Sequence, residues 1–124
     1  MSQIIYHFDG HTVALGQTHP EVDYKLQGNP KNRWVILTAE NPNGELFPVF
    51  VNKQRTITFQ YDLEDSFYQF SKGKGVAEGY PEEVSFLILG VDLKEAFALA
   101  QKYKQQAIIT GVVGGFAELI RLEA

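Results

Sequence analysis

The chain has 124 residues, of which 44% are hydrophobic and 21% charged, so its composition is that of an ordinary globular protein and disorder is excluded. Its 15 acidic and 11 basic residues give a net charge of −4, which argues against duplex nucleic acid as a partner because phosphate contacts require clustered lysine and arginine. It has no cysteine, so disulfides and cysteine-ligated metals are excluded, and no apolar stretch predicts a membrane span. We expect one cytoplasmic domain over residues 1–124.

The first third of the chain predicts a hairpin followed by a short helix. Residues 1–16 alternate in hydrophobicity around the turn pair Asp9-Gly10, which indicates a β-hairpin at the edge of a sheet. The sequence Thr18-His19-Pro20-Glu21 has the pattern of a capping box with proline in the first turn. We expect the helix that it opens to end at Gly28-Asn29-Pro30.

Two near-continuous apolar runs, residues 33–40 and 84–91, are typical of central strands that are covered on both faces. The first run ends in polar residues before a break at Pro42-Asn43-Gly44, so it delivers polar side chains at the end of a strand. Between the two runs, residues 67–70 predict a strand that leads into a loop at residues 72–75.

The last third of the chain predicts a helix and a second hairpin. Asp92 with Glu95 three residues later is the signature of a helix N-terminus, and we expect the helix to cover residues 93–104. Residues 107–113 and 116–122 are two apolar strands joined by a pair of glycines.

Residues 46–65 allow two interpretations. The alternating, β-branched sequence of residues 56–61 favours a strand. On a helical wheel, however, the apolar residues fall within one arc of about 140°, which favours a helix. The residues of this arc are Leu46, Phe47, Phe50, Val51, Ile57 and Tyr61. Asn52, Arg55 and Phe59 would then share the opposite flank, and the segment alone leaves both interpretations open.

The order of several motifs resembles one bacterial family. The motifs are TAENP, then Asn52 with Arg55, then Tyr68 ahead of GKG, then YPEEVSFLILGVDLKEAFALAQKY, QQAIITG and AELIRL. In this order they resemble the uncharacterised family catalogued as domain of unknown function 3293, from about residue 33 to residue 122. The resemblance implies a helix over residues 46–65 and implies no particular activity.

Together these elements predict a single α+β domain. We expect a mixed, mostly antiparallel sheet with two main helices and one short N-terminal helix, the helices packing largely on one face.

Polar residues after the first central strand form the candidate site. Asn41 and Asn43 follow the strand, and Asn52 and Arg55 lie one helical turn apart, so they could face one opening. Amides donate and accept hydrogen bonds, and arginine binds phosphate or carboxylate by a two-pronged contact. The alternatives are plain turn chemistry for Asn-Pro-Asn-Gly and a solvated helix face with Arg55 paired to an acid.

The sequence Lys72-Gly73-Lys74-Gly75 offers backbone amides and two ammonium groups to an anion. It lacks the spacing and context of known phosphate-loop motifs, so an ordinary lysine-glycine loop is the alternative.

Evidence for catalysis is weaker. Glu40 or Glu82 could act as a general base with Arg55 holding an anion, but no nucleophile or cofactor motif accompanies them. The histidines, His7, His11 and His19, lack metal-ligand spacing, so we expect neither a metal nor a cofactor.

The leading hypothesis is a binding module for a small polar ligand, phosphorylated or nucleotide-like. Its contacts would be Asn41, Asn43, Asn52 and Arg55, with residues 72–75 closing over the charge. One alternative is a small hydrolase or transferase. Another is a protein-interaction domain, including a homo-oligomer, which would use an exposed patch formed by Phe47, Phe50 and Phe59.

Overall fold

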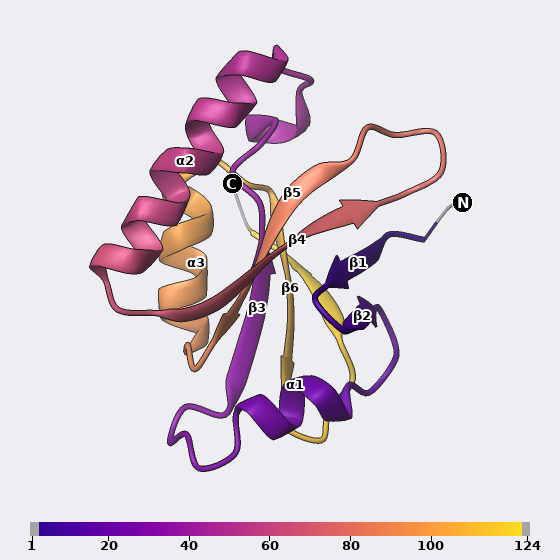
Figure 1. Ribbon diagram of the computed structural model, residues 1–124, viewed down its shortest axis with the longest axis vertical. Helices are drawn as coiled ribbons and strands as arrows, with labels where there is room; N and C mark the ends of the chain where they lie inside the picture. Colours follow the sequence, from indigo (N-terminus) through magenta and orange to yellow (C-terminus); the bar gives the residue numbers. More distant parts are fainter. Residues whose placement is uncertain (1–2, 123–124) are drawn as a thin grey trace.

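An antiparallel sheet of seven strands runs through the computed structural model, which describes residues 3–122 (Figure 1). The strands are β1 (Ile5–Phe8), β2 (His11–Ala14), β3 (Arg33–Leu37), β4 (Gln69–Val76), β5 (Glu83–Leu89), β6 (Ala107–Val112) and β7 (Glu118–Arg121). The helices are α1 (Pro20–Lys25), α2 (Val49–Asp65) and α3 (Leu93–Lys102), and a short 3-10 turn, η1, covers Pro42–Gly44.

The strand order is β2-β1-β4-β5-β3-β6-β7. Every pairing among the described strands is antiparallel, so the α+β class is confirmed, and the parallel pair of a mixed sheet is not found between residues 3 and 122. The predicted hairpins at the two ends of the chain are also present, and β2 and β7 form the edges of the sheet.

The two apolar runs are central strands, as predicted. β3 pairs with β5 on one side and with β6 on the other. Val35 and Leu37 belong to one hydrophobic cluster, while Trp34 and Ile36 belong to a second cluster, because successive side chains of a strand point to opposite faces. Both faces of β3 are therefore buried, which explains its uninterrupted apolar sequence.

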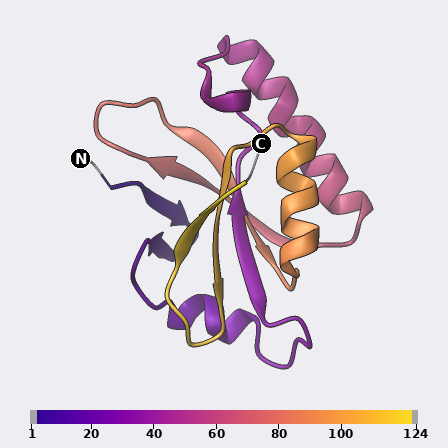
Figure 2. The same cartoon turned by 180° about the vertical axis from the view of Figure 1, so that it is seen from behind.

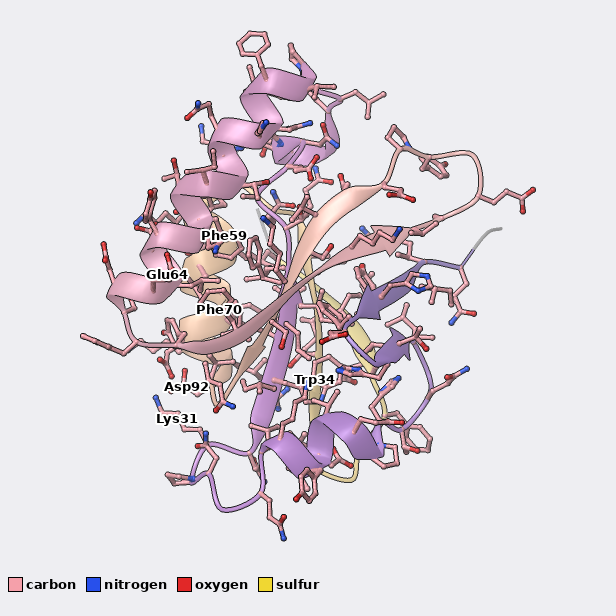
Figure 3. All side chains as sticks on the ribbon, viewed as in Figure 1. Lys31, Trp34, Phe59, Glu64, Phe70 and Asp92 are labelled. Carbon is pink, nitrogen blue, oxygen red and sulfur yellow. The ribbon has the colours of Figure 1, made fainter. Side chains whose placement is uncertain are left out.

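The two long helices lie side by side over one face of the sheet (Figures 1 and 2). Phe59 of α2 is fully buried, and its ring lies 5.2 Å from that of Phe86 on β5 and 4.6 Å from that of Tyr103 after α3. Figure 3 labels Phe59 and Phe70 in this layer. Burial of a side chain of this size contributes roughly 1.5–3 kcal/mol, so these aromatic contacts anchor both helices to the sheet.

The short helix α1 covers the opposite face, where Val22 and Leu26 pack in the cluster of Trp34. The predicted capping box of α1 is wrong. His19, not Thr18, is the N-cap residue and its side chain makes no capping bond. Thr18 forms a β-bridge with Phe116, and the His19 Nε2 atom accepts a hydrogen bond from the Ala14 amide at 3.1 Å. These contacts hold the segment extended up to the start of the helix.

The helical interpretation of residues 46–65 is confirmed, but the expected buried face is wrong. The buried residues of α2 are Asn52, Thr56, Phe59 and Leu63. The predicted apolar arc faces outward instead, with Phe50 73% exposed and Tyr61 63% exposed. The patch that was expected to combine Phe47, Phe50 and Phe59 does not form, because Phe59 packs in the core.

The expected loop at Lys72-Gly73-Lys74-Gly75 is also wrong, because these residues lie inside β4 and pair with β5. The glycines are required by a close approach of β1. A Cβ atom on Gly73 would lie 2.1 Å from the carbonyl oxygen of His7, which no side chain tolerates. The preceding strand begins at Gln69 rather than at Phe67, which is 94% exposed and has a φ of 59°.

The start of α3 follows the prediction closely. The Glu95 amide donates to Asp92 Oδ1 at 2.8 Å, and the Asp92 amide donates to Glu95 Oε1 at 3.2 Å, so the capping box is complete. The helix ends at Lys102, two residues before the expected end at 104.

Candidate functional site

The end of β3, the turn η1, the first turns of α2 and the start of β5 meet at one edge of the fold. Asn41 connects β3 to η1 and has a φ of 51°, in the left-handed region that asparagine tolerates better than most residues. Asn43 adopts a similar conformation, with a φ of 58°. The Asn-Pro-Asn-Gly segment is therefore a genuine tight turn, and it positions Asn41 against α2.

Asn41 and Asn52 form a pair of reciprocal hydrogen bonds. The Asn41 amide N–H donates to Asn52 Oδ1, and Asn52 Nδ2 donates to Asn41 Oδ1, both at 2.9 Å. Asn41 Nδ2 also donates to Glu83 Oε2 at 2.8 Å, and the Phe47 amide donates to Asn41 Oδ1 at 2.9 Å. These bonds join β3, α2 and β5 and fix the orientation of both amide groups.

Two carboxylates lie next to this pair. Glu40 Oε2 accepts a hydrogen bond from the Val84 amide at 2.5 Å. Burial raises the pKa of Glu83, the negative charge of Glu40 raises it further, and the hydrogen bond from Asn41 opposes the shift. Burial, with a smaller effect of Glu83, raises the pKa of Tyr6 to about 12. Glu83 therefore holds a proton more readily than an exposed glutamate does.

A cavity of about 590 Å³ opens beside the asparagine pair. Its apolar lining includes side chains from the start of α2 and from β5. Its polar and charged lining residues are Glu40, Asn41, Asn52, Lys53, Thr56, Lys72 and Glu82. Thr56 is only 5% exposed, and its hydroxyl has no hydrogen-bond partner among residues 3–122. Thr56 thus brings a buried, unsatisfied hydroxyl to the wall of this cavity, which is called the first cavity below.

A second cavity of about 490 Å³ adjoins the first. The two share Asn41, Leu46 and Pro81 as lining residues. Tyr6 and Glu83 supply polar groups to the second cavity. Asn41 therefore lies between the two cavities and contributes to the lining of both.

The structure brings together half of the predicted site residues. Asn41, Asn52 and Lys72 line the first cavity, and Gly75 lines the second. The other predicted residues, Asn43, Arg55, Gly73 and Lys74, line neither cavity.

Arg55 points into the fold instead of into a cavity. Its Nε donates to the Ala39 carbonyl and its Nη2 to the Tyr103 carbonyl, both at 2.6 Å. The guanidinium group thus connects α2 to the end of β3 and the end of α3, in place of the ion pair with an acid that was the structural alternative.

Several cavity residues escaped the sequence interpretation. Thr56 lies four residues after Asn52, and this helical spacing was the available signal. Glu82 and Glu83 looked alike in the sequence, but Glu82 is exposed and lies 3.6 Å from Lys74, whereas Glu83 bonds to Asn41. Tyr6 comes from a distant strand, and no local pattern connects it to the site.

Between residues 3 and 122 no cluster of three or more histidine, cysteine or acidic residues is arranged to hold a metal. No helix in this range has the length and apolarity that crossing a bilayer requires.

Comparison with known families gives one match. The model of the family described as "Protein of unknown function (DUF3293)" matches residues 37–108, from the end of β3 to the start of β6. The matched range includes Asn41, Asn52, Thr56 and Glu83. Comparisons with curated proteins and with solved structures gave no match.

Proposed function

The chain belongs to the family described as Protein of unknown function (DUF3293), and from the geometry of its site we propose that it is a binding module for a small polar ligand, phosphorylated or nucleotide-like. The ligand would occupy the first cavity and extend toward the second. We also propose a cytoplasmic location, which the lack of cysteine supports.

The observation that carries this proposal is the Thr56 hydroxyl. Buried polar groups almost always have a hydrogen-bond partner, and leaving one without a partner costs about 1–3 kcal/mol. Thr56 faces a cavity of about 590 Å³, which is the size of ordinary small-molecule sites. A polar ligand atom would satisfy the hydroxyl and would lie beside the fixed amides of Asn41 and Asn52.

Two glutamates, Glu40 and Glu82, and two lysines line the first cavity, and we propose that the lysines hold an anionic group of the ligand. Lys53 and Lys72 both line it and both are exposed, and within residues 3–122 neither lies in an ion pair. Ammonium groups bind phosphate as point charges. The apolar walls, which include Leu46 and Val84, would contact a base or another flat ligand body.

A small hydrolase or transferase is the second candidate, and Glu83 is the observation that favours it. Of the carboxylates near the cavities, Glu40 is bonded to the Val84 amide and Glu82 lies beside Lys74. Glu83 has a raised pKa and faces the second cavity with Tyr6, as a general acid or base requires. Turnover of the bound ligand that Glu83→Gln abolishes, with binding retained, would identify an enzyme.

The binding proposal is tested by thermal shift followed by calorimetry. The panel contains inorganic phosphate, nucleotides and sugar phosphates, and we expect at least one compound to raise the melting temperature. Lys53→Ala and Lys72→Ala should each lower the affinity for that compound about tenfold, which is equivalent to about 1.4 kcal/mol of binding free energy. Lys94→Ala is the matched control because Lys94 is an exposed lysine on α3, away from both cavities.

Thr56→Val separates the binding role of the hydroxyl from its effect on folding. Valine keeps the shape of threonine and removes the unsatisfied group, so the ligand-free variant should be at least as stable as the wild type. Its ligand affinity should fall. A panel without any response, or equal losses in Lys94→Ala and Lys72→Ala, would contradict the proposal.

A further inference from the structure

One side of α2 carries exposed apolar side chains spaced along its length. Phe50 is 73% exposed, Ile57 41% and Tyr61 63%. Together with Lys53 and Glu64, these residues form a continuous band, called the α2 stripe below. A globular monomer turns such a band toward its core, so its exposure indicates a surface that another protein covers.

The α2 stripe contains a hollow that fits a side chain of another helix. Ile57, Gln60, Tyr61 and Glu64 surround about 430 Å³ of open space. They occupy positions i, i+3, i+4 and i+7, which are the four positions that form the hole in knobs-into-holes packing of helices. Phe50 lies seven residues before Ile57, on the same side of the helix, and projects as a knob.

The charges along α2 indicate the direction of the partner helix. Glu64 and Asp65 lie in the last turn, where no basic residue accompanies them, and the first turn has no acidic residue. Figure 3 labels Glu64 at this C-terminal end. Acidic groups at a helix C-terminus oppose the helix dipole, so α2 alone is poorly compensated at both ends. A second α2 helix that lies antiparallel to the first would bring its own acidic C-terminal residues to the N-terminus of the first helix. It would also bring its own Lys53 toward the C-terminus of the first helix.

We propose that α2 docks antiparallel against α2 of a second copy of this chain, with the two-fold axis near Ile57. This axis places Phe50 opposite residue 64 of the other copy, since both lie seven residues from Ile57. Each Phe50 packs at the Glu64 end of the other copy's hollow, and the acidic end of each α2 stripe lies near the other Lys53. Knob and hollow are on the same chain, as a symmetric dimer interface requires.

The proposed dimer interface and the ligand site share two residues, because Lys53 and Ile57 of the α2 stripe also line the first cavity. Phe50 and Tyr61 line neither the first nor the second cavity, so their substitution tests the dimer without removing a ligand contact. The interface therefore borders the first cavity, whereas Asn52 and Thr56 are buried on the core side of α2.

Light scattering over a range of micromolar concentrations tests the pairing. The wild type should have twice the chain mass of 14.0 kDa. Phe50→Glu should weaken the dimer about hundredfold, since interface anchors of this kind contribute 2 kcal/mol or more. Tyr24→Glu should leave it intact, because Tyr24 is equally exposed, at 76%, but belongs to α1 on the opposite face. Circular dichroism checks that the variants are folded.

Cysteine cross-linking tests the geometry, because the chain has no natural cysteine. Residue 57 lies at the proposed axis, so the Ile57→Cys variant should form a disulfide between the two chains of the dimer under mild oxidation. Phe67→Cys, at a 94% exposed position beyond the end of α2, should not. A wild type that is monomeric throughout, a dimer that survives Phe50→Glu, or equal cross-linking at both positions would each overturn the proposal.

Discussion

Arg55 joins three elements through one side chain. It belongs to α2, and its guanidinium group donates to carbonyl groups at the end of β3 and at the end of α3, at 2.6 Å in each case. Arginine suits this role because its donors lie in a rigid planar fork, whereas lysine has a single ammonium group. Arg55 therefore holds the walls of the first cavity in place without lining it.

Arg55→Lys should lower the free energy of unfolding by about 2 kcal/mol, because a lysine cannot satisfy both carbonyl groups. Ligand affinity of the folded variant should stay within about threefold of the wild type. Urea unfolding and calorimetry measure the two effects, with Thr58→Ala as an exposed control on the same helix. Unchanged stability with lost binding would show instead that Arg55 contacts the ligand.

At the residue scale, the sequence predicted where a side chain lies better than it predicted the groups to which that side chain is hydrogen-bonded. Asn41 and Asn52 were expected to face one opening, and both line the first cavity, because a strand end and a helical turn define where they lie. Arg55 was expected to bind an anion, yet its partners are backbone carbonyls 16 and 48 residues away. A carbonyl group is present at every residue, so no side-chain pattern in the sequence marks these two.

Glu95, at the start of α3, is the centre of a cluster of hydrogen bonds. Glu95 accepts hydrogen bonds from Lys31 Nζ at 2.5 Å and from the Tyr68 hydroxyl at 2.7 Å, besides its capping bond to the Asp92 amide. Figure 3 labels Lys31 and Asp92 close together at this corner. The bond to Lys31, with smaller contributions from Tyr68 and Asp92, lowers the pKa of Glu95 to about 2.

This shift predicts how stability depends on pH. Between the folded pKa of about 2 and the ordinary value of 4.5, the unfolded chain binds more protons at Glu95 than the folded chain does. The contribution of Glu95 is therefore complete above about pH 4.5 and is lost as the pH falls toward 2. Glu95→Gln should flatten the loss of stability between pH 5 and about pH 2.5, as measured by urea unfolding.

The control for the pH experiment is Glu118→Gln, which changes an exposed glutamate on the edge strand β7. It should reproduce the wild-type slope. Equal slopes for the wild type and Glu95→Gln would contradict the assignment.

At the element scale, helix and strand periodicity located most elements but did not orient all of them. The helix α3 and the central strands β3 and β5 were predicted correctly, because each is apolar where it meets the core. α2 is the exception, because its core side includes Asn52 and Thr56 and its solvent side includes Phe50. A helix on a sheet usually buries its apolar side and exposes its polar side, and α2 departs from this pattern. The ligand proposal depends on the polar residues on its core side, and the dimer proposal depends on the apolar residues on its solvent side.

At the scale of the whole molecule, the sheet separates the candidate site from α1 and leaves it at one edge of the central strands. Most cavity residues lie within the family match at 37–108. Tyr6 comes from β1, which reaches the second cavity by pairing with β4. This pairing of β1 with β4 depends on Gly73 and Gly75, which have no side chain to block the approach of β1. In the sequence, glycines that alternate with lysines are typical of a loop instead.

The central claim, that a small polar ligand occupies the first cavity, is tested most directly by nuclear magnetic resonance of the ¹⁵N-labelled protein. The titrant is the compound with the largest thermal shift in the panel. The largest amide shift changes should fall at Asn41, Asn52, Thr56 and Lys72, with none at Val22 on the opposite face. Changes centred on α1, or spread evenly over the chain, would contradict the account.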